Sequence, residues 1–498
     1  MNSLKVKVLL VFMFFGFQSF AQELFQPNWK SLKTYTVPDW FRDAKFGIFI
    51  HWGVYSVPAY GGGGIFGEWY GNDMYQKGSA AYKHHIETYG TQDKFGYKDF
   101  IPMFKGEKFD ADAWAKLFKK AGAKYVVPVA EHHDGFAMYD TKLSKWNSVN
   151  MGPKRDVIGE LSTSIRKEGM IFGLSSHRAE HWYFYHNGRD IKSDVNDPKF
   201  DDLYGPAATG EDSLSTTKIS PVFLNDWLLR NTELVDKYKP QLFWFDWWLD
   251  NPSFQPYLKS FAAYYYNAGI AMNKGVVLNY KNTAFPDSAA VIDFERDGDT
   301  KISKLPWQSD DSVGDRSWGY IEDDHYKTPQ FLIDGLIDIV SKNGNLLLNI
   351  GPKADGTIPE VQQHLLLEMG KWLDVNGEAI YGTRPWKIFG EGPGMIAAAE
   401  KAKQNADSYK PEEKEFTAQD FRFTTKGDDI FAIALKIPTG KIILKSFGKT
   451  QLKKKVTAIK LLGSSKDLKW KQTNDALVID AVGVYPSEYA ASFQVAVK

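Results

Sequence analysis

Short apolar runs alternate with helix-like segments over most of this 498-residue chain. Eight of these runs have the length and the residue content of buried strands. Buried strands that alternate with helices indicate a parallel sheet, and eight such units predict a closed (β/α)8 barrel. A doubly wound open sheet is the alternative, although no G-x-G-x-x-G follows the first run. The runs span residues 46–53, 124–135, 170–177, 241–246, 275–280, 290–296, 306–310 and 345–352.

Helical patterns fall between several of the runs. The segment DADAWAKLFKKAGA places apolar residues, Trp114 and Phe118 among them, at helical spacing. TPQFLIDGLIDIVSKNG repeats this pattern, and Gly344 is the predicted stop of that helix. A further helix over residues 359–377 closes the predicted barrel.

The residue pattern changes after about Pro385. A charged, polar stretch over residues 400–415 predicts an exposed loop, and short strands separated by Gly, Asp and Ser turns follow it. This pattern is typical of a small antiparallel β-sandwich. We therefore predict a (β/α)8-like catalytic domain over residues 22–385 and a C-terminal β-sandwich over residues 386–498.

The N-terminus, MNSLKVKVLLVFMFFGFQSFAQ, has the features of a secretory signal peptide. Two lysines precede an apolar run over residues 8–17, and Ser-Phe-Ala at 19–21 is a small-x-small cleavage site. The run is shorter than the ~20 residues that a membrane span needs. The chain has no cysteine, and therefore no disulfide, thiolate metal site or lipobox. We predict a signal peptide over residues 1–21, no membrane span, and secretion, with the bacterial periplasm as the best fit.

Charge and aromatic content narrow the class of ligand. Lys+Arg and Asp+Glu both total 61, and no basic run dominates any segment, so a nucleic-acid partner is not expected. Aromatic residues reach 15% of the chain. Because exposed rings stack on sugars and bases, this excess favours a stacking ligand.

Polar residues that finish the apolar runs are the candidates for chemistry, because working residues in such barrels lie at the carboxyl ends of the strands. In QLFWFDWW, Asp246 stands among aromatic residues, where a carboxylate without a partner or a function carries a large burial cost. Adjacent His132 and His133 both face one site only if the strand has ended before them. The other candidates are His51, Glu68, Trp69, Asp134, His177 and Glu295.

Two chemistries fit this set of residues. A metal hydrolase would gather the histidines and a carboxylate around zinc, but the chain has no H-x-H or H-E-x-x-H spacing. Glycoside hydrolysis would use two carboxylates in an aromatic pocket, with histidines bonding the sugar hydroxyls. The aromatic content and the lack of metal motifs favour the second chemistry, with no metal and no other cofactor.

Several blocks resemble the α-L-fucosidases of glycoside hydrolase family 29. They are WFRDAKFGIFIHWGVYSVPAY, GEWY, KYVVPVAEHHDGFAMYDTKLSKWNS, GPKRDVIGEL, FWFD, SWGY, NGNLLLNIGPKADGTIP and KWLDVNGEAIYGTRPW, which occur in that order between residues 30 and 390. The resemblance implies a barrel followed by a β-sandwich. It also implies retaining, exo-acting hydrolysis of terminal α-L-fucose from glycans, without a metal.

The resemblance implies roles for individual residues. Asp246 matches the nucleophile, through which a covalent fucosyl-enzyme intermediate forms in a double displacement. Trp244 and Trp318 match aromatic positions that line the sugar pocket. The positions that hold the fucose hydroxyls and ring match His51, Glu68, Trp69, His132 and His133.

The chain departs from the family pattern at three places. Where many members carry a glutamic acid in a WE pair, this chain has Gln308, so the resemblance favours Glu295 as the general acid/base. GLSSHRAEHW lacks an expected tyrosine, which His177 or His181 replaces in our interpretation. Lys281 stands where members have an arginine. The weaker rivals for the acid/base are Asp293, Asp297, Asp310 and Asp311.

Two alternatives to a fucosidase stay open from the sequence. Loss of the usual acid at Gln308 is compatible with a fucose-binding protein of lost or weak catalysis. A glycosidase for a related sugar such as galactose would use the same pocket. The expected partner is in each case a glycan, and no motif predicts an oligomeric state.

Overall fold

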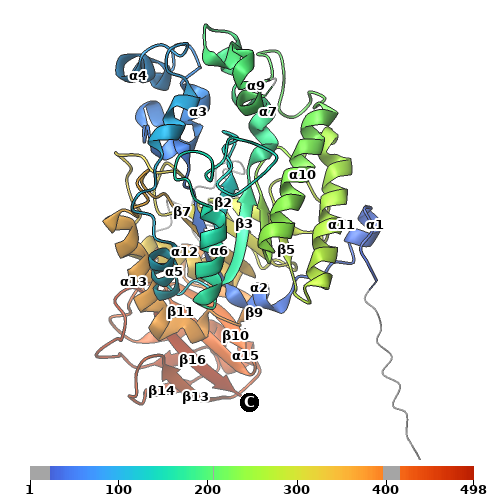
Figure 1. Ribbon diagram of the computed structural model, residues 1–498. Coiled ribbons are helices and arrows are strands. Elements are labelled where there is room, and N and C mark those ends of the chain that lie inside the picture. The colour runs from blue at the N-terminus through green and yellow to red at the C-terminus, as the bar shows by residue number, and fades with distance from the viewer. Residues whose placement is uncertain (1–22, 206, 396–415) are drawn as a thin grey trace, which may run out of the picture.

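The computed structural model describes residues 23–205, 207–395 and 416–498 (Figure 1). The predicted signal peptide and the predicted loop at 400–415 lie outside the described residues. Eight parallel strands form a closed barrel in which each strand pairs with the next and β8 pairs with β1, so the predicted barrel is confirmed. The strands are β1 (Phe46–Ile50), β2 (Tyr125–Glu131), β3 (Ile171–Ser176), β4 (Leu242–Phe245), β5 (Val277–Tyr280), β6 (Val291–Glu295), β7 (Trp307–Ser312) and β8 (Gly344–Ile350).

Long helices connect the strands and pack around the barrel. Helix α5 begins after Asp110, whose side chain accepts a hydrogen bond from the Ala113 N–H at 3.0 Å. The long helices are α5 (Ala111–Lys120), α6 (Val157–Lys167), α10 (Pro221–Tyr238), α11 (Gln255–Ala271), α12 (Pro329–Ser341) and α13 (Glu360–Asn376). The others are α1 (Trp29–Leu32), α2 (Asp39–Ala44), α3 (Tyr70–Asp73), α4 (Ala80–Tyr89), α7 (His181–Phe184), α8 (His186–Arg189), α9 (Asp201–Tyr204) and α15 (Lys449–Leu452).

The predicted stop of helix α12 at Gly344 is wrong. The helix ends at Ser341, and Asn343 adopts the left-handed conformation with φ of 79°. Gly344 is already the first residue of β8. A Cβ at Gly344 would lie 2.7 Å from the Trp307 ring, so this position needs glycine for a close strand-to-strand approach.

Alternate residues of the barrel strands face two different packing environments. Phe243 and Phe245 of β4 pack outward, with Phe243 against Phe261 of α11 at a ring separation of 4.8 Å. Trp244 belongs instead to a cluster with Phe49, Val127, Leu242 and Leu347, which fills the barrel interior. Because strand side chains alternate, the residue after β4 on the face of Trp244 is Asp246. The FWFD pattern therefore aims its carboxylate into the mouth of the barrel.

The C-terminal part forms two antiparallel sheets, as predicted. One has the strand order β13-β16-β11-β10-β9 and the other β12-β15-β14. In Figure 1 these sheets lie at the end of the barrel opposite to α3, α4, α7 and α9. The strands are β9 (Arg384–Glu391), β10 (Phe421–Lys426), β11 (Asp429–Ala434), β12 (Ile442–Leu444), β13 (Val456–Leu461), β14 (Trp470–Gln472), β15 (Leu477–Ile479) and β16 (Ala491–Val497).

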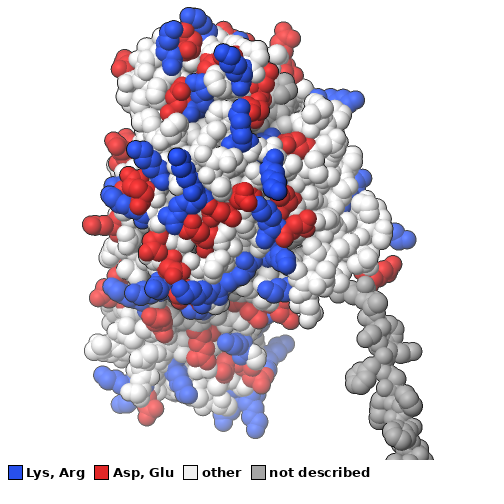
Figure 2. All heavy atoms as spheres, in the orientation of Figure 1, with Lys and Arg blue, Asp and Glu red and all other residues white. Residues whose placement is uncertain are grey.

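The C-terminal domain attaches to the barrel through a buried ion pair. Arg422 of β10 donates to Asp338 of α12 at 2.6 Å, and both side chains are buried. The face drawn in Figure 2 carries acidic and basic side chains interspersed, without a single-sign field. Within the described part of the chain, no helix combines the length and the apolar character needed to cross a bilayer.

Candidate active site

A pocket of about 390 Å³ opens where the carboxyl ends of the barrel strands meet. Its volume is within the range of small-ligand sites. Aromatic rings, imidazoles and carboxyl groups all contribute to the wall, which is the mixture expected for a sugar site. The lining residues are His51, Phe66, Glu68, Trp69, His132, His133, His177, Glu180, Trp244, Asp246, Trp247, Trp248, Glu295, Asp310 and Trp318.

The strand ends explain how adjacent side chains reach one pocket. Strand β2 ends at Glu131, so His132 and His133 lie beyond the alternation of the strand and both line the pocket. Asp246 and His177 likewise follow the last residues of β4 and β3. Glu295 is the last residue of β6.

Asp246 is held by an imidazole. His177 donates from Nδ1 to the Asp246 Oδ2 at 2.9 Å, and the other ring nitrogen of His177 lies 2.9 Å from the Ser175 hydroxyl. Because a carboxylate only accepts, Nδ1 carries a proton, and in the neutral ring Ser175 donates to Nε2. The Asp246 side chain is 13% exposed, whereas that of His177 is 1% exposed.

The charge of Asp246 is stabilised although the group is buried. Burial alone would raise the pKa of Asp246. The nearby His177, the hydrogen bond from it, His133 and the ammonium of Lys281 outweigh burial and hold that pKa well below its usual range. Asp246 is therefore an ionised carboxylate at neutral pH, as a nucleophile must be.

Three other histidines near Asp246 are neutral. Burial, with the neighbouring imidazoles, holds the pKa of His51 and of His132 well below the usual value, and burial lowers the pKa of His133 to about 4. His51 donates from Nδ1 to the Asn349 Oδ1 at 2.7 Å, and His133 contacts the His177 carbonyl through Nδ1 at 2.8 Å. The Nε2 atoms of His51 and His133 are consequently acceptors, suited to sugar hydroxyl groups.

A second carboxyl group and two tryptophans complete this side of the pocket. Glu68 accepts from the Gly319 N–H at 2.8 Å and from the Ser317 hydroxyl at 3.2 Å. Burial raises the pKa of Glu68 to about 7. The Trp69 ring lies 5.3 Å from the His133 ring, and the Trp318 ring lies 5.5 Å from the His51 ring.

Glu295 lies on the opposite strand ends, beside a buried lysine. Trp247 donates from Nε1 to the Glu295 Oε2 at 2.5 Å, and the Lys281 Nζ lies 3.6 Å from the same oxygen. The Glu295 side chain is 30% exposed, so it is the more accessible of the two predicted catalytic carboxyl groups.

Lys281 is not among the lining residues, and it joins a buried acidic pair. Its ammonium contacts Asp310 and lies 3.1 Å from Asp293. Burial and the charge of Asp293 raise the pKa of Asp310 well above its usual value. Burial alone would raise the pKa of Asp293, but Lys281 and hydrogen bonds from neighbouring side chains outweigh burial and lower that pKa. Asp310 is thus protonated and donates to ionised Asp293.

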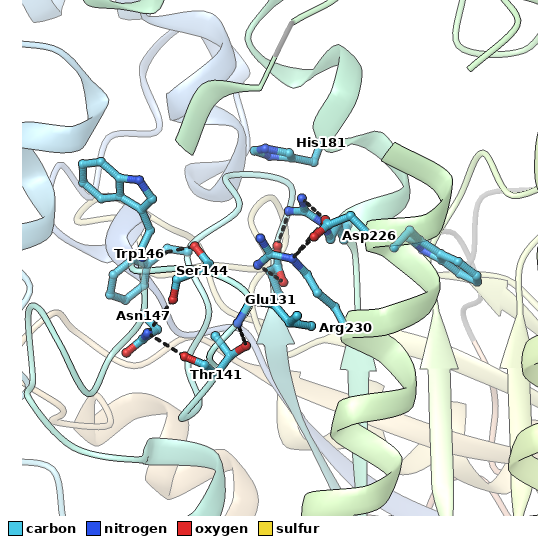
Figure 3. A network of polar contacts seen from close by, with 12 residues as sticks. Glu131, Thr141, Ser144, Trp146, Asn147, His181, Asp226 and Arg230 are labelled. Atoms are coloured by element: carbon cyan, nitrogen blue, oxygen red, sulfur yellow. Dashed lines mark hydrogen bonds and ion pairs between the residues drawn. The ribbon is translucent and has the colours of Figure 1, made fainter. Parts of the chain in front are cut away.

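A network of charged side chains joins the end of β2 to α10 (Figure 3). Glu131, the last residue of β2, accepts from Arg178 at 2.5 Å and from Arg230 of α10 at 3.3 Å. Asp226 accepts from both arginines. The network therefore ties the end of β2, which carries His132 and His133, to the turn that follows His177.

Two sequence candidates, and the glutamine at the position of the usual acid, make structural hydrogen bonds outside the pocket wall. His181 is buried outside the lining and hydrogen-bonds the His133 carbonyl through Nδ1 at 2.8 Å. Asp134 makes a turn, accepting from the Phe136 N–H at 3.0 Å, and also accepts from Tyr97. Gln308 is buried, donates to Asp293 at 2.5 Å and accepts from Tyr125 at 2.8 Å.

The lining contains residues that the sequence did not single out as a binding site. Glu180 is the most consequential, because it is a third buried carboxyl group near Asp246. Asp310 was weighed only as a rival acid. The remaining additions are Phe66, Trp247 and Trp248. The glutamic acid in GLSSHRAEHW was the available signal for Glu180.

Two groups of lining residues have metal-ligand geometry. One is His51, His132 and His177, and the other is His133, His177 and Asp246, with ligand atoms within 4.8 Å of one another in each group. Most of these nitrogens already have protein partners: His51 bonds Asn349, and His177 bonds both Asp246 and Ser175.

Comparisons with known proteins place the chain in a family. The sequence model of the α-L-fucosidase family matches residues 13–378, and that of the α-L-fucosidase C-terminal domain matches residues 413–496. Human tissue α-L-fucosidase is 32% identical over 486 residues, which cover 95% of this chain and 91% of that protein. The bovine tissue enzyme is 32% identical, covering 90% and 84%.

Solved structures of α-fucosidases share the architecture. The Thermotoga maritima α-fucosidase superimposes with a TM-score of 0.75 at 32% identity, covering 95% of this chain and 100% of that one. An α-L-fucosidase of Bacteroides thetaiotaomicron, 23% identical with a TM-score of 0.64, shares the fold over 92% of this chain and 94% of its own. The chain belongs to the α-L-fucosidase family, and it is a glycoside hydrolase of that class.

Proposed function

We propose that this protein is a retaining, exo-acting α-L-fucosidase that works by double displacement. The observation that carries the proposal is the position of Asp246, which accepts a hydrogen bond from His177 and lines a pocket of aromatic rings and imidazoles. Glu295 lines the same pocket from β6 and supplies the second carboxyl group that the reaction needs.

In the first step, Asp246 attacks the anomeric carbon of a terminal α-L-fucosyl residue. The bond from that carbon to the leaving oxygen breaks as protonated Glu295 gives its proton to the oxygen. The product of this step is a fucosyl ester of Asp246 with the β configuration. In the second step, Glu295 takes a proton from water, whose oxygen displaces Asp246 and releases α-L-fucose.

The pocket residues have distinct tasks in this proposal. His51, His132, His133 and Glu68 hold the sugar hydroxyl groups, and the rings of Trp69, Trp244 and Trp318 cover its apolar surface. Because aromatic rings displace water from the sugar surface that they cover, they strengthen the electrostatic contacts within the site. A Thermotoga maritima relative has been solved with fucose and with a mechanism-based inhibitor, which supports assigning fucose to this pocket.

The alternative of a binding protein without catalysis rested on Gln308. The side chain of Gln308 is buried between Tyr125 and Asp293, where it serves packing and hydrogen bonding. Glu295 lies at the end of the neighbouring strand and lines the pocket. A carboxyl group is thus available to act as the acid without Gln308.

The fucosidase proposal is tested by proton NMR of a reaction with an aryl α-L-fucoside. Release of α-L-fucose as the first anomer supports retention. Release of β-L-fucose as the first anomer would contradict double displacement. If the protein releases no sugar from α-L-fucosides but cleaves α-L-galactosides, its substrate is the related sugar instead.

We also propose that the protein is exported, with its first 21 residues acting as a signal peptide, and that it is located in the bacterial periplasm. The motif that supports this is the lysine-flanked apolar run with Ser-Phe-Ala at 19–21. N-terminal sequencing of the periplasmic fraction should begin at Gln22. A mature protein that begins at Met1 in the cytoplasm would contradict it.

A further inference from the structure

Three buried polar atoms of the pocket lining have no hydrogen-bond partner within the described chain. They are Oε1 of Glu68, Nδ1 of His132 and Oε2 of Glu180. Because a buried polar atom without a partner is costly, such atoms in a ligand pocket mark positions where the ligand completes the bonding. Glu68 and His132 already have proposed roles with fucose hydroxyl groups, whereas Glu180 has none.

The carboxyl group of Glu180 is firmly positioned. Glu180 ends the short 3-10 turn η5 (Arg178–Glu180), which follows β3 directly after His177. Only 2% of the residue is exposed. The start of the turn is anchored by Arg178, which donates to Glu131 and to Asp226. A carboxyl group placed in this way has little freedom to turn away from the pocket.

The neighbours of Glu180 are His133 and Asp246. His133 donates its Nδ1–H to a carbonyl, and burial lowers the pKa of the ring to about 4, so its Nε2 carries a lone pair at neutral pH. That Nε2 lies 3.3 Å from Oε2 of Glu180 and 3.5 Å from Oδ2 of Asp246. Three acceptors would face one another if Glu180 were ionised. The cluster is favourable when Glu180 carries a proton.

The electrostatic environment agrees with the hydrogen-bond pattern. Burial, followed by the negative charges of Asp246 and Glu295, raises the pKa of Glu180 well above its usual value. The charged groups that act on Glu180 are thus both carboxyl groups, and the imidazole beside it is that of His133. Nothing among them stabilises a further negative charge.

We infer that Glu180 is a substrate-binding residue which contacts a ring hydroxyl group of fucose as a neutral carboxylic acid. This inference rests on the proposed function and adds a recognition group to the same pocket. The acid O–H donates to the sugar hydroxyl oxygen, and the hydroxyl proton goes to an acceptor nearby, His133 Nε2 being 3.3 Å from the acid. A neutral donor avoids placing a second anion next to Asp246.

Two near-isosteric variants separate this inference from other roles. Glu180→Gln keeps a donor and an acceptor, as in the neutral acid, while Glu180→Met removes both and leaves no cavity. Glu87→Gln, on the exposed side of α4, is the matched control. Binding of L-fucose and of its 2-, 3- and 4-deoxy analogues is measured by calorimetry, so that no turnover is needed.

Glu180→Met should bind L-fucose about tenfold more weakly than the wild type, as expected for one lost hydrogen bond. In the wild type, each deoxy analogue should bind more weakly than L-fucose. In Glu180→Met, this difference in affinity should almost vanish for one analogue and stay unchanged for the other two. Glu180→Gln should bind L-fucose within about threefold of the wild type. Thermal unfolding of each variant verifies that it is folded.

The inference is overturned if Glu180→Met binds L-fucose as the wild type does, or if all three differences in affinity persist in it. Equal weakening by Gln and Met would overturn the neutral acid form. A Glu180→Gln variant that binds normally but is inactive on aryl fucosides until azide is added would make Glu180 a catalytic carboxyl group instead. If wild-type protein does not bind L-fucose, the proposed function fails together with this inference.

Discussion

The Nδ1 atom of His177 donates a hydrogen bond of 2.9 Å to the Oδ2 atom of Asp246, across 69 residues of sequence. Ser175 donates to the other nitrogen of the same ring, so a chain of hydrogen bonds ends on the proposed nucleophile. This chain fixes the tautomer of the imidazole and the orientation of the carboxylate.

Replacing His177 should impair the nucleophile. His177→Phe removes the donor, so kcat/KM on an aryl α-L-fucoside should fall by about 10- to 100-fold, as expected for a hydrogen bond to a charged group. The pKa of Asp246 is lowered by His177, so its loss raises that pKa. Since Asp246 must be ionised to attack, the acidic limb of the pH profile should move to higher pH.

A conservative variant is the control for this prediction. His177→Gln retains a side-chain N–H and should recover part of the rate and of the acidic limb. An unchanged acidic limb in His177→Phe, with both variants folded, would show that His177 does not act through Asp246.

The buried cluster of Lys281, Asp293 and Asp310 predicts unequal effects of two similar substitutions. Asp310 is already protonated, so Asp310→Asn should change the free energy of unfolding by less than about 1 kcal/mol. Asp293→Asn removes the ionised partner of buried Lys281, so that Asp310 must ionise in its place, and it should cost more, about 1–3 kcal/mol. Urea denaturation at pH 7 measures both values, and equal effects would contradict the assigned protonation states.

The ion pairs of Glu131 with Arg178 and Arg230 predict that replacing this one carboxylate by an amide has a large effect on stability. Glu131→Gln leaves two buried guanidinium groups short of an anion and should lower the free energy of unfolding by about 3 kcal/mol. Glu160→Gln, which breaks the more exposed pair with Arg155, should cost no more than about 1 kcal/mol. A similar cost for both would mean that burial does not matter in this network.

Metal removal should leave the activity intact. The double displacement uses two carboxyl groups, and His51 and His177 are engaged with Asn349 and Asp246. Prolonged dialysis against EDTA, followed by an assay on an aryl α-L-fucoside, should give the untreated rate. A loss of activity that Zn²⁺ restores would place a metal in one of the histidine groups.

The barrel could be predicted because its evidence is local. Each strand is a short apolar run, and the polar residue that ends it, such as Asp246 or Glu295, is visible in the sequence. Because side chains alternate along a strand, His132 and His133 could face one site only if the strand ended before them, and in the structure β2 ends at Glu131 and both side chains line the pocket. Most of the pocket-lining residues could therefore be predicted from the ends of the strands.

What the sequence could not supply depends on contacts between distant segments. Glu180 reaches the pocket through a 3-10 turn, which has no periodic signal. The bond of His177 to Asp246 and the pairing of Lys281 with Asp310 join different strands, so neither residue reveals its partner from its own neighbours. The stop of α12 was misassigned because Asn343, rather than Gly344, takes the left-handed conformation.

The central claim is that Asp246 is the nucleophile of a retaining fucosidase. Its most direct test is the reaction of Asp246→Gly with an aryl α-L-fucoside in the presence of azide. Without azide the variant should be at least ~1000-fold slower than the wild type. Azide should restore part of the rate and give β-L-fucosyl azide, because it attacks from the face that Asp246 vacates. A near-normal rate without azide, or a rescued product with the α configuration, would contradict the claim.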